Sequence, residues 1–157
     1  MNSEKREQIK ILLAEDDADD REFFHEAVLS SHAHVQFAIV SDGKFLIKYL
    51  SSCKRDDIDI LFLDINMPYM NGIECLRAIR NNETFRDLPV IMLSTSSFPS
   101  DINQTFKDGA NMYVSKPAFF NDEINILKNI FEMYYNGELL IPDRKKYFLK
   151  PSGFSVM

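Results

Sequence analysis

Cysteine is scarce in this chain of 157 residues, occurring only as Cys53 and Cys75. Neither residue lies in a CxxC motif or at a Cys/His spacing, so the sequence predicts neither a disulfide framework nor a zinc site. Long apolar runs are also missing. None approaches the roughly 20 residues of a membrane-spanning helix, and residues 1–10 lack the apolar core of a signal peptide. We therefore expect a cytoplasmic protein that does not bind a membrane.

Positive charge is in deficit as well. The chain has 18 Lys and Arg against 24 Asp and Glu, a formal net charge of −6. Because phosphate binding depends mainly on Lys and Arg, this balance argues against a general nucleic-acid clamp. No segment resembles a helix-turn-helix, so we expect no direct DNA binding. The hydrophobic content of 45% is enough for the core of one domain.

Short β-rich apolar runs alternate with helical patterns from residue 9 to residue 134, which is typical of βαβ units around a parallel sheet. The pattern predicts an α/β fold, with a doubly wound five-stranded parallel sheet and five helices. The predicted strands are Ile9–Ala14, Val35–Val40, Ile58–Leu63, Val90–Leu93 and Met112–Ser115. The predicted helices are Ala18–Ser31, Lys44–Cys53, Gly72–Asn81, Ser100–Asp108 and Asn121–Tyr135.

The alternation breaks at Asn136-Gly137. We therefore divide the chain into a domain of residues 8–135 and a C-terminal extension of residues 136–157 without a fold of its own. Apolar clusters at 139–141 and 147–149 flank a mostly basic turn in the extension. Two alternatives stay open: a frayed terminus, or a segment that packs on the domain or on a second copy of the chain.

Polar side chains gather where the predicted strands end, which is where open parallel sheets place their working residues. Crowded carboxylates repel one another, and a hard divalent cation such as Mg²⁺ relieves that repulsion. The side chains are Glu15, Asp16 and Asp17 after the first strand, Asp64 after the third, Ser94 and Thr95 after the fourth, and Ser115, Lys116 and Pro117 at the end of the fifth.

Asp64 is the most informative of these acids. The apolar run 60–63 carries its carboxylate to the edge of the sheet. Such a carboxylate can attack a phosphoryl donor and form an aspartyl phosphate. Mg²⁺, Lys116 and the hydroxyl of Ser94 can position and neutralise the phosphoryl oxygens.

Four segments together resemble the receiver domain of two-component response regulators, the CheY-like family. The resemblance covers residues 8 to 135 and is closest to receivers that carry no attached output domain. It implies a flavodoxin-like sheet with strand order 2-1-3-4-5. Each motif alone is weak, but their order, each after a predicted strand, is specific. The segments are Glu15-Asp16-Asp17, Asp64 in DINMPYMNG, Ser94 in LPVIMLSTSS, and Lys116-Pro117 in GANMYVSKP.

The resemblance implies a role for each residue of the phosphorylation and metal site. Asp64 matches the phosphoacceptor, and Lys116 matches the lysine that pairs with the phosphoryl group. Asp17 and Asp64 match the carboxylate ligands of Mg²⁺. The backbone carbonyl of Asn66 matches a third ligand, and Asp16 would hold a metal-bound water. Asn66 also stands at a position that tunes hydrolysis in the family.

The resemblance also implies a switch. Ser94 matches the switch hydroxyl, and Tyr113 matches the aromatic that turns inward when this hydroxyl moves toward the phosphate. Pro117 matches the family's cis proline. Thr95 is larger than the usual alanine or glycine, so we expect it to narrow access to the phosphoryl group. Ser96 is small and should leave room for the hydrolytic water.

The implied function is a phosphorylation-operated switch rather than an enzyme with a metabolite substrate. Asp64 would accept a phosphoryl group from a sensor histidine kinase or a histidine phosphotransfer protein. A surface around the fourth helix, fifth strand and fifth helix would then change its affinity for a downstream protein. A homodimer could form through that surface or through the extension.

Other functions stay open. A degenerate receiver would act as an adaptor without phosphorylation, which the intact Asp64 and Lys116 argue against. A Mg²⁺-dependent phosphohydrolase of the haloacid-dehalogenase type would also form an aspartyl phosphate. Such an enzyme needs a second acid two residues after the nucleophile, where this chain has Asn66. A nucleotide or flavin binder is disfavoured because the first turn, EDDADD, has no glycine-rich phosphate cradle.

Overall fold

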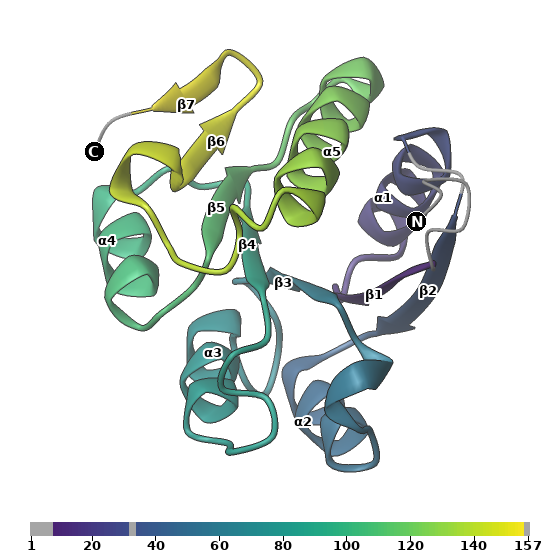
Figure 1. Cartoon of the computed structure of the whole chain (residues 1–157), viewed down its shortest axis with the longest axis vertical. Helices are drawn as coiled ribbons and strands as arrows, with labels where there is room; N and C mark the ends of the chain where they lie inside the picture. The colour runs from purple at the N-terminus through teal and green to yellow at the C-terminus, as the bar shows by residue number, and fades with distance from the viewer. Residues whose placement is uncertain (1–7, 32–33, 156–157) are drawn as a thin grey trace.

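A seven-stranded sheet in the order β2-β1-β3-β4-β5-β6-β7 forms the centre of the molecule in the computed structural model, which describes residues 8–31 and 34–155. The first five strands are parallel to one another, and five helices cover the two faces of the sheet (Figure 1). These strands are β1 (Ile9–Ala14), β2 (Val35–Val40), β3 (Ile60–Asp64), β4 (Val90–Ser94) and β5 (Met112–Ser115). The helices are α1 (Ala18–Ser31), α2 (Gly43–Ser51), α3 (Gly72–Arg80), α4 (Pro99–Lys107) and α5 (Phe120–Tyr135), with a 3₁₀ turn, η2, at Arg55–Asp57.

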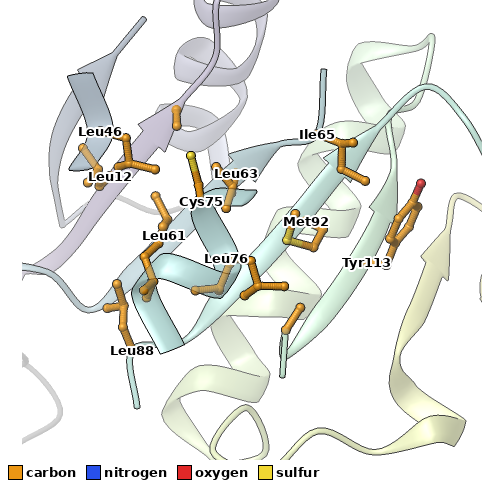
Figure 2. Close-up of a cluster of buried hydrophobic side chains, with 14 of the residues drawn as sticks. Leu12, Leu46, Leu61, Leu63, Ile65, Cys75, Leu76, Leu88, Met92 and Tyr113 are labelled. Atoms are coloured by element: carbon orange, nitrogen blue, oxygen red, sulfur yellow. The ribbon is translucent and has the colours of Figure 1, made fainter. Parts of the chain in front are cut away.

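The sequence prediction of a flavodoxin-like α/β fold with five helices is confirmed, as is the strand order 2-1-3-4-5 for the first five strands. The central strand β3 is buried along its whole length. Its side chains alternate between the two faces, so Leu61 and Leu63 pack toward α2 and α3, whereas Ile60 and Phe62 pack toward α1 and α5. Figure 2 shows the first of these two core layers.

The prediction of only five strands was wrong. Part of the C-terminal extension forms a 3₁₀ turn, η3 (Arg144–Lys146), and two strands, β6 (Phe148–Lys150) and β7 (Gly153–Ser155). Strand β6 pairs with β5 in parallel, and β7 returns antiparallel to β6. Three-residue strands are too short for a period-2 pattern to be recognised in a sequence.

The extension packs on the domain rather than fraying. The hydroxyl of Tyr147 donates a 2.7 Å hydrogen bond to the hydroxyl of Thr105 in α4. Arg144 donates to the Asn103 side chain of the same helix at 2.9 Å, and its guanidinium lies over the ring of Phe106. Of the two alternatives that the sequence left open, the described part of the extension therefore follows the second, with its own domain as the partner.

The parallel arrangement brings the ends of four strands to one edge of the sheet. Residue pairing places Ala14 beside Leu63 and Ser94 beside Ser115, so the loops that follow these strands start at the same level. Among the helices of the described residues, none is both long and apolar enough to cross a membrane.

Candidate functional site

Asp64 is the last residue of β3, and its side chain is only 6% exposed. The loop that follows Asp64 makes a tight turn. The backbone N–H of Asn66 donates to Oδ1 of Asp64 at 3.4 Å, and the backbone N–H of Gly72 donates to the carbonyl of Ile65 at 2.8 Å. A Cβ atom on Gly72 would lie 2.3 Å from the carbonyl oxygen of Asp64, so only glycine allows the start of α3 to approach this closely.

Three carboxylates meet at this edge. Glu15, Asp16 and Asp64 each offer an oxygen atom, and these oxygens lie within 4.8 Å of one another. Carboxylate oxygens are the ligands that hard divalent cations prefer, and a cation would offset the repulsion among three acids. The donor set therefore fits Mg²⁺ or a similar ion.

Asp17, which the sequence analysis expected to be a metal ligand, is not part of this group. Its Oδ1 accepts a hydrogen bond of 2.9 Å from the backbone N–H of Asp20, and its carbonyl accepts from Arg21 at 3.0 Å. Asp17 thus directly precedes helix α1 and caps its N-terminus. The backbone N–H of Glu15 still bonds to the carbonyl of Val40 in the sheet, so the acid that turns toward Asp64 is Asp16, one residue earlier than expected. Which of Asp16 and Asp17 binds a metal ion stays a prediction.

Arg21 fixes the backbone of the acidic turn. Its Nη1 donates to the carbonyl oxygens of Glu15 at 3.0 Å and of Asp16 at 2.9 Å. Because the guanidinium binds the main chain, it leaves the carboxylates free to face the centre of the site.

Lys116 follows β5 and lies between several acids. Its Nζ donates to Oε1 of Glu15 at 2.5 Å and to Oδ2 of Asp20 at 3.2 Å, and it is 3.5 Å from Oδ1 of Asp64. Burial alone would lower the pKa of the ammonium group, but the hydrogen bond to Glu15 and the charges of the surrounding acids raise it. Lys116 is therefore a permanent positive charge at this site.

The neighbouring acids have perturbed proton affinities. Burial, and then the adjacent Asp64 carboxylate, raise the pKa of Glu15 to about 7 even though Lys116 acts in the opposite direction. Partial burial likewise raises the pKa of Asp16. Burial is the largest cause of both shifts, and a neighbouring acid adds to each of them, Asp64 for Glu15 and Glu15 for Asp16.

Ser94 and Tyr113 lie close together on the neighbouring strands β4 and β5, and their role as a switch stays a prediction. Ser94 is fully buried, and its hydroxyl accepts a 3.0 Å hydrogen bond from the backbone N–H of Ser96. Tyr113 is also fully buried, and its hydroxyl donates to the carbonyl of Ser96 at 2.8 Å. The aromatic ring therefore faces inward and holds the loop between β4 and α4.

The predictions for Pro117 and Thr95 have different outcomes. No cis peptide bond occurs in the described part of the chain, so the Lys116–Pro117 bond is trans and the expected cis proline was wrong. The trans form is favoured even before proline, by about 0.5–1 kcal/mol. The side chain of Thr95 is exposed beside the site, and its effect on access stays a prediction.

The structure adds residues that the sequence analysis did not place at the site. Asp20 reaches Lys116 from the first turn of α1, and Glu123 is buried near it in the first turns of α5. The spacing of Glu123 could have revealed it, because it stands three and four residues before the buried Ile126 and Leu127 and so interrupts the apolar stripe of its helix.

Comparison with known proteins agrees with this geometry. The family model for the response regulator receiver domain matches residues 11–128. A chemotaxis protein CheY homolog of Campylobacter jejuni is 36% identical over 64 residues, 41% of this chain and 49% of that protein. The chain thus spans about half the length of that curated relative.

Solved structures give the same result. The phosphorylated cyanobacterial phytochrome response regulator RcpA is 29% identical, with a TM-score of 0.74 over 83% of this chain and 96% of that one. The Mn²⁺-bound form of response regulator Rcp1 is 24% identical, with a TM-score of 0.70 over 86% of this chain and 99% of that one, and shows the shared fold.

Proposed function

The chain belongs to the response regulator receiver domain family of two-component signalling, and on that premise we propose that Asp64 accepts a phosphoryl group and that the phosphorylated chain changes its binding to a partner protein. The observation that carries the proposal is the environment of Asp64. Its carboxylate ends a rigid, buried strand, lies 3.5 Å from Lys116, and shares its edge of the sheet with Glu15 and Asp16.

The chemistry follows from this arrangement. An oxygen of Asp64 forms a bond to phosphorus while the bond between phosphorus and the donor breaks, and the donor leaves with the bonding electrons. Lys116 pairs with the negative charge of the phosphoryl oxygens. The hydroxyl of Ser94, at the end of β4, would be the second group that binds them. The donor would be a histidine kinase or a histidine phosphotransfer protein.

Mg²⁺ would be held by the carboxylates of Asp16 and Asp64 and by the backbone carbonyl of Asn66, with Glu15 as the adjacent acid. Asp16 replaces Asp17 in this assignment because Asp16 belongs to the acid group and Asp17 caps α1. When bound, the ion supplies positive charge to the oxygens of the transferred group.

Signal output would depend on Tyr113 and the loop it holds. Its hydroxyl binds the carbonyl of Ser96, so a movement of Ser94 toward a phosphoryl group would displace the loop that leads into α4. A downstream protein would read the resulting change of surface. A homodimer, the cytoplasmic location and the identity of the partner stay predictions from the sequence.

The test is the intact mass of the protein after incubation with Mg²⁺ and acetyl phosphate. We expect one added phosphoryl group on the natural chain, and on an Asp56→Asn control that removes an exposed acid elsewhere. We expect none on Asp64→Asn or after chelation of the metal. If the natural chain gains no phosphoryl group and does not bind beryllofluoride, phosphorylation is excluded and the adaptor alternative is supported.

A further inference from the structure

The ammonium group of Lys116 lies closer to two other acids than to Asp64. Its Nζ makes hydrogen bonds to Glu15 at 2.5 Å and to Asp20 at 3.2 Å, whereas Asp64 is the most distant of the three acids at 3.5 Å. Phosphoryl oxygens on Asp64 would have to compete with these closer carboxylates for the same ammonium group.

A small cavity adjoins Lys116 and the two acids that it binds most closely, Glu15 and Asp20. It has a volume of about 50 Å³ and lies between α1 and α5. Three carboxylates line it together with Lys116: those of Glu15, Asp20 and Glu123. The rest of the lining is apolar, so these acids and the ammonium group lie in a poorly solvated place.

Glu123 is the most buried of these acids after Glu15. It is only 5% exposed, and burial raises the pKa of its carboxyl group, while the charge of Lys116 acts in the opposite direction. Asp20 and Glu123 come from the two helices that pack against each other beside the site, so neither belongs to the loops that carry the acids of the metal site.

We propose that Asp20 is a positioning residue that holds Lys116 in a resting place and thereby weakens the binding of a phosphoryl group at Asp64. The proposal rests on the proposed function. Asp20 does not touch the reacting atoms and acts through Lys116. Because the Asp20 side chain is about half exposed, its competition for the ammonium group is modest.

The experiment measures the dissociation constant of beryllofluoride, a phosphoryl mimic, by calorimetry in saturating Mg²⁺. We expect Asp20→Asn to bind about two- to fivefold more tightly than the natural chain, the range for an exposed ion pair. The matched control is Asp19→Asn, which removes a neighbouring exposed acid in the same turn of α1 and should leave the constant unchanged. Equal or weaker binding by Asp20→Asn would overturn the proposal.

A double variant separates competition for the lysine from direct repulsion of the anion. If Asp20 acts through Lys116, then Asp20→Asn should have no effect in a Lys116→Met background. A gain of the same size in that background would mean that Asp20 repels the anion directly, and the proposal would fail.

A structure of the natural chain with bound beryllofluoride provides a second, independent test of the proposal. We expect Nζ of Lys116 to bind the mimic and to have left Asp20. An Nζ that still lies within hydrogen-bonding distance of Asp20 would overturn the inference. Failure of the proposed function is distinguishable from either result, because the natural chain itself would then bind no beryllofluoride.

Discussion

The ring of Tyr113 packs edge-on against the ring of Phe148, with centroids 5.7 Å apart and ring planes at 82°. This contact joins the predicted switch residue to the C-terminal extension. The backbone N–H of Tyr113 also donates to the carbonyl of Tyr147 at 2.8 Å, and the Tyr113 hydroxyl holds the carbonyl of Ser96 on its other side. The extension therefore covers the edge of β5, part of the surface on which the sequence analysis placed partner binding.

Phe148→Ala should destabilise the fold by about 3 kcal/mol, because it removes a buried ring that packs on Tyr113 in the same core cluster. Urea unfolding followed by circular dichroism measures the change. The control is Phe154→Ala, which removes a more exposed ring from β7, the next strand, and should cost about 1 kcal/mol or less. Equal losses for the two variants would show that the ring of Phe148 is not part of the core.

Tyr147→Phe should cost about 1 kcal/mol, since it removes only the hydroxyl group that donates to Thr105. The Thr105 hydroxyl keeps its own bonds to the carbonyls of Asp101 and Ile102. The same unfolding assay applies, with Tyr69→Phe as the control because that side chain is 79% exposed. A loss as small as that of the control would mean that the hydrogen bond contributes nothing to holding the extension on α4.

Asn111→Leu should destabilise the chain by about 3 kcal/mol. Its Oδ1 accepts from the backbone N–H of Val90 and from Arg80, both at 2.9 Å, and its Nδ2 donates to the carbonyl of Leu139. Leucine would leave these buried groups without their partner. Thermal unfolding of the variant, compared with Asn125→Leu at an exposed position of α5, measures the cost. A variant as stable as this control would contradict the structure at this point.

The elements that the sequence predicted well are those with a strong local pattern. Helix α1 and strands β1, β2 and β5 have the predicted bounds, because apolar periodicity and turn residues agree there. Strands β6 and β7 were missed for a physical reason: each has three residues and is defined by its pairing partner rather than by its own sequence.

The residues of the candidate site were likewise predictable from the sequence only in part. Asp64 and Lys116 could be placed from the sequence because each directly follows an apolar strand. The choice between Asp16 and Asp17 could not be made, since it depends on where the chain leaves the sheet, a difference of one residue. The contact between Asp20 and Lys116 joins residues 96 positions apart in the sequence, and only the packing of the domain brings them together.

Mg²⁺ binding should separate the proposed role of Asp16 as a metal ligand from that of Asp17 as a helix cap. Mg²⁺ that binds the folded state raises the midpoint of thermal unfolding by mass action. We expect Asp16→Asn to abolish this increase and Asp17→Asn to retain it, although Asp17→Asn should lose up to about 0.5 kcal/mol of stability because its capping carboxylate becomes an amide. The midpoints are compared with and without Mg²⁺. Loss of the increase in Asp17→Asn alone would restore the original assignment.

Glu123 should make stability depend on pH. Burial raises the pKa of its carboxyl group to about 7 in the folded chain, from about 4.3 in the unfolded chain, with Asp20 raising it and Lys116 lowering it. Between these values the folded state holds a proton that the unfolded state has released. The stabilisation is therefore complete below about pH 4.3 and is lost as the pH rises through 7.

The free energy of unfolding in metal-free buffer should thus fall by on the order of 2 kcal/mol between pH 5 and pH 7.5 through Glu123. Glu15 lines the same cavity with a pKa that burial also raises to about 7, so its contribution has the same sign and remains in a Glu123 variant. Glu123→Gln should therefore flatten the dependence without abolishing it, whereas Glu132→Gln, at an exposed position of the same helix, should leave it unchanged. An identical slope in Glu123→Gln and the natural chain would show that this carboxyl group titrates with its ordinary pKa, and that the wall of the cavity is better solvated than its burial indicates.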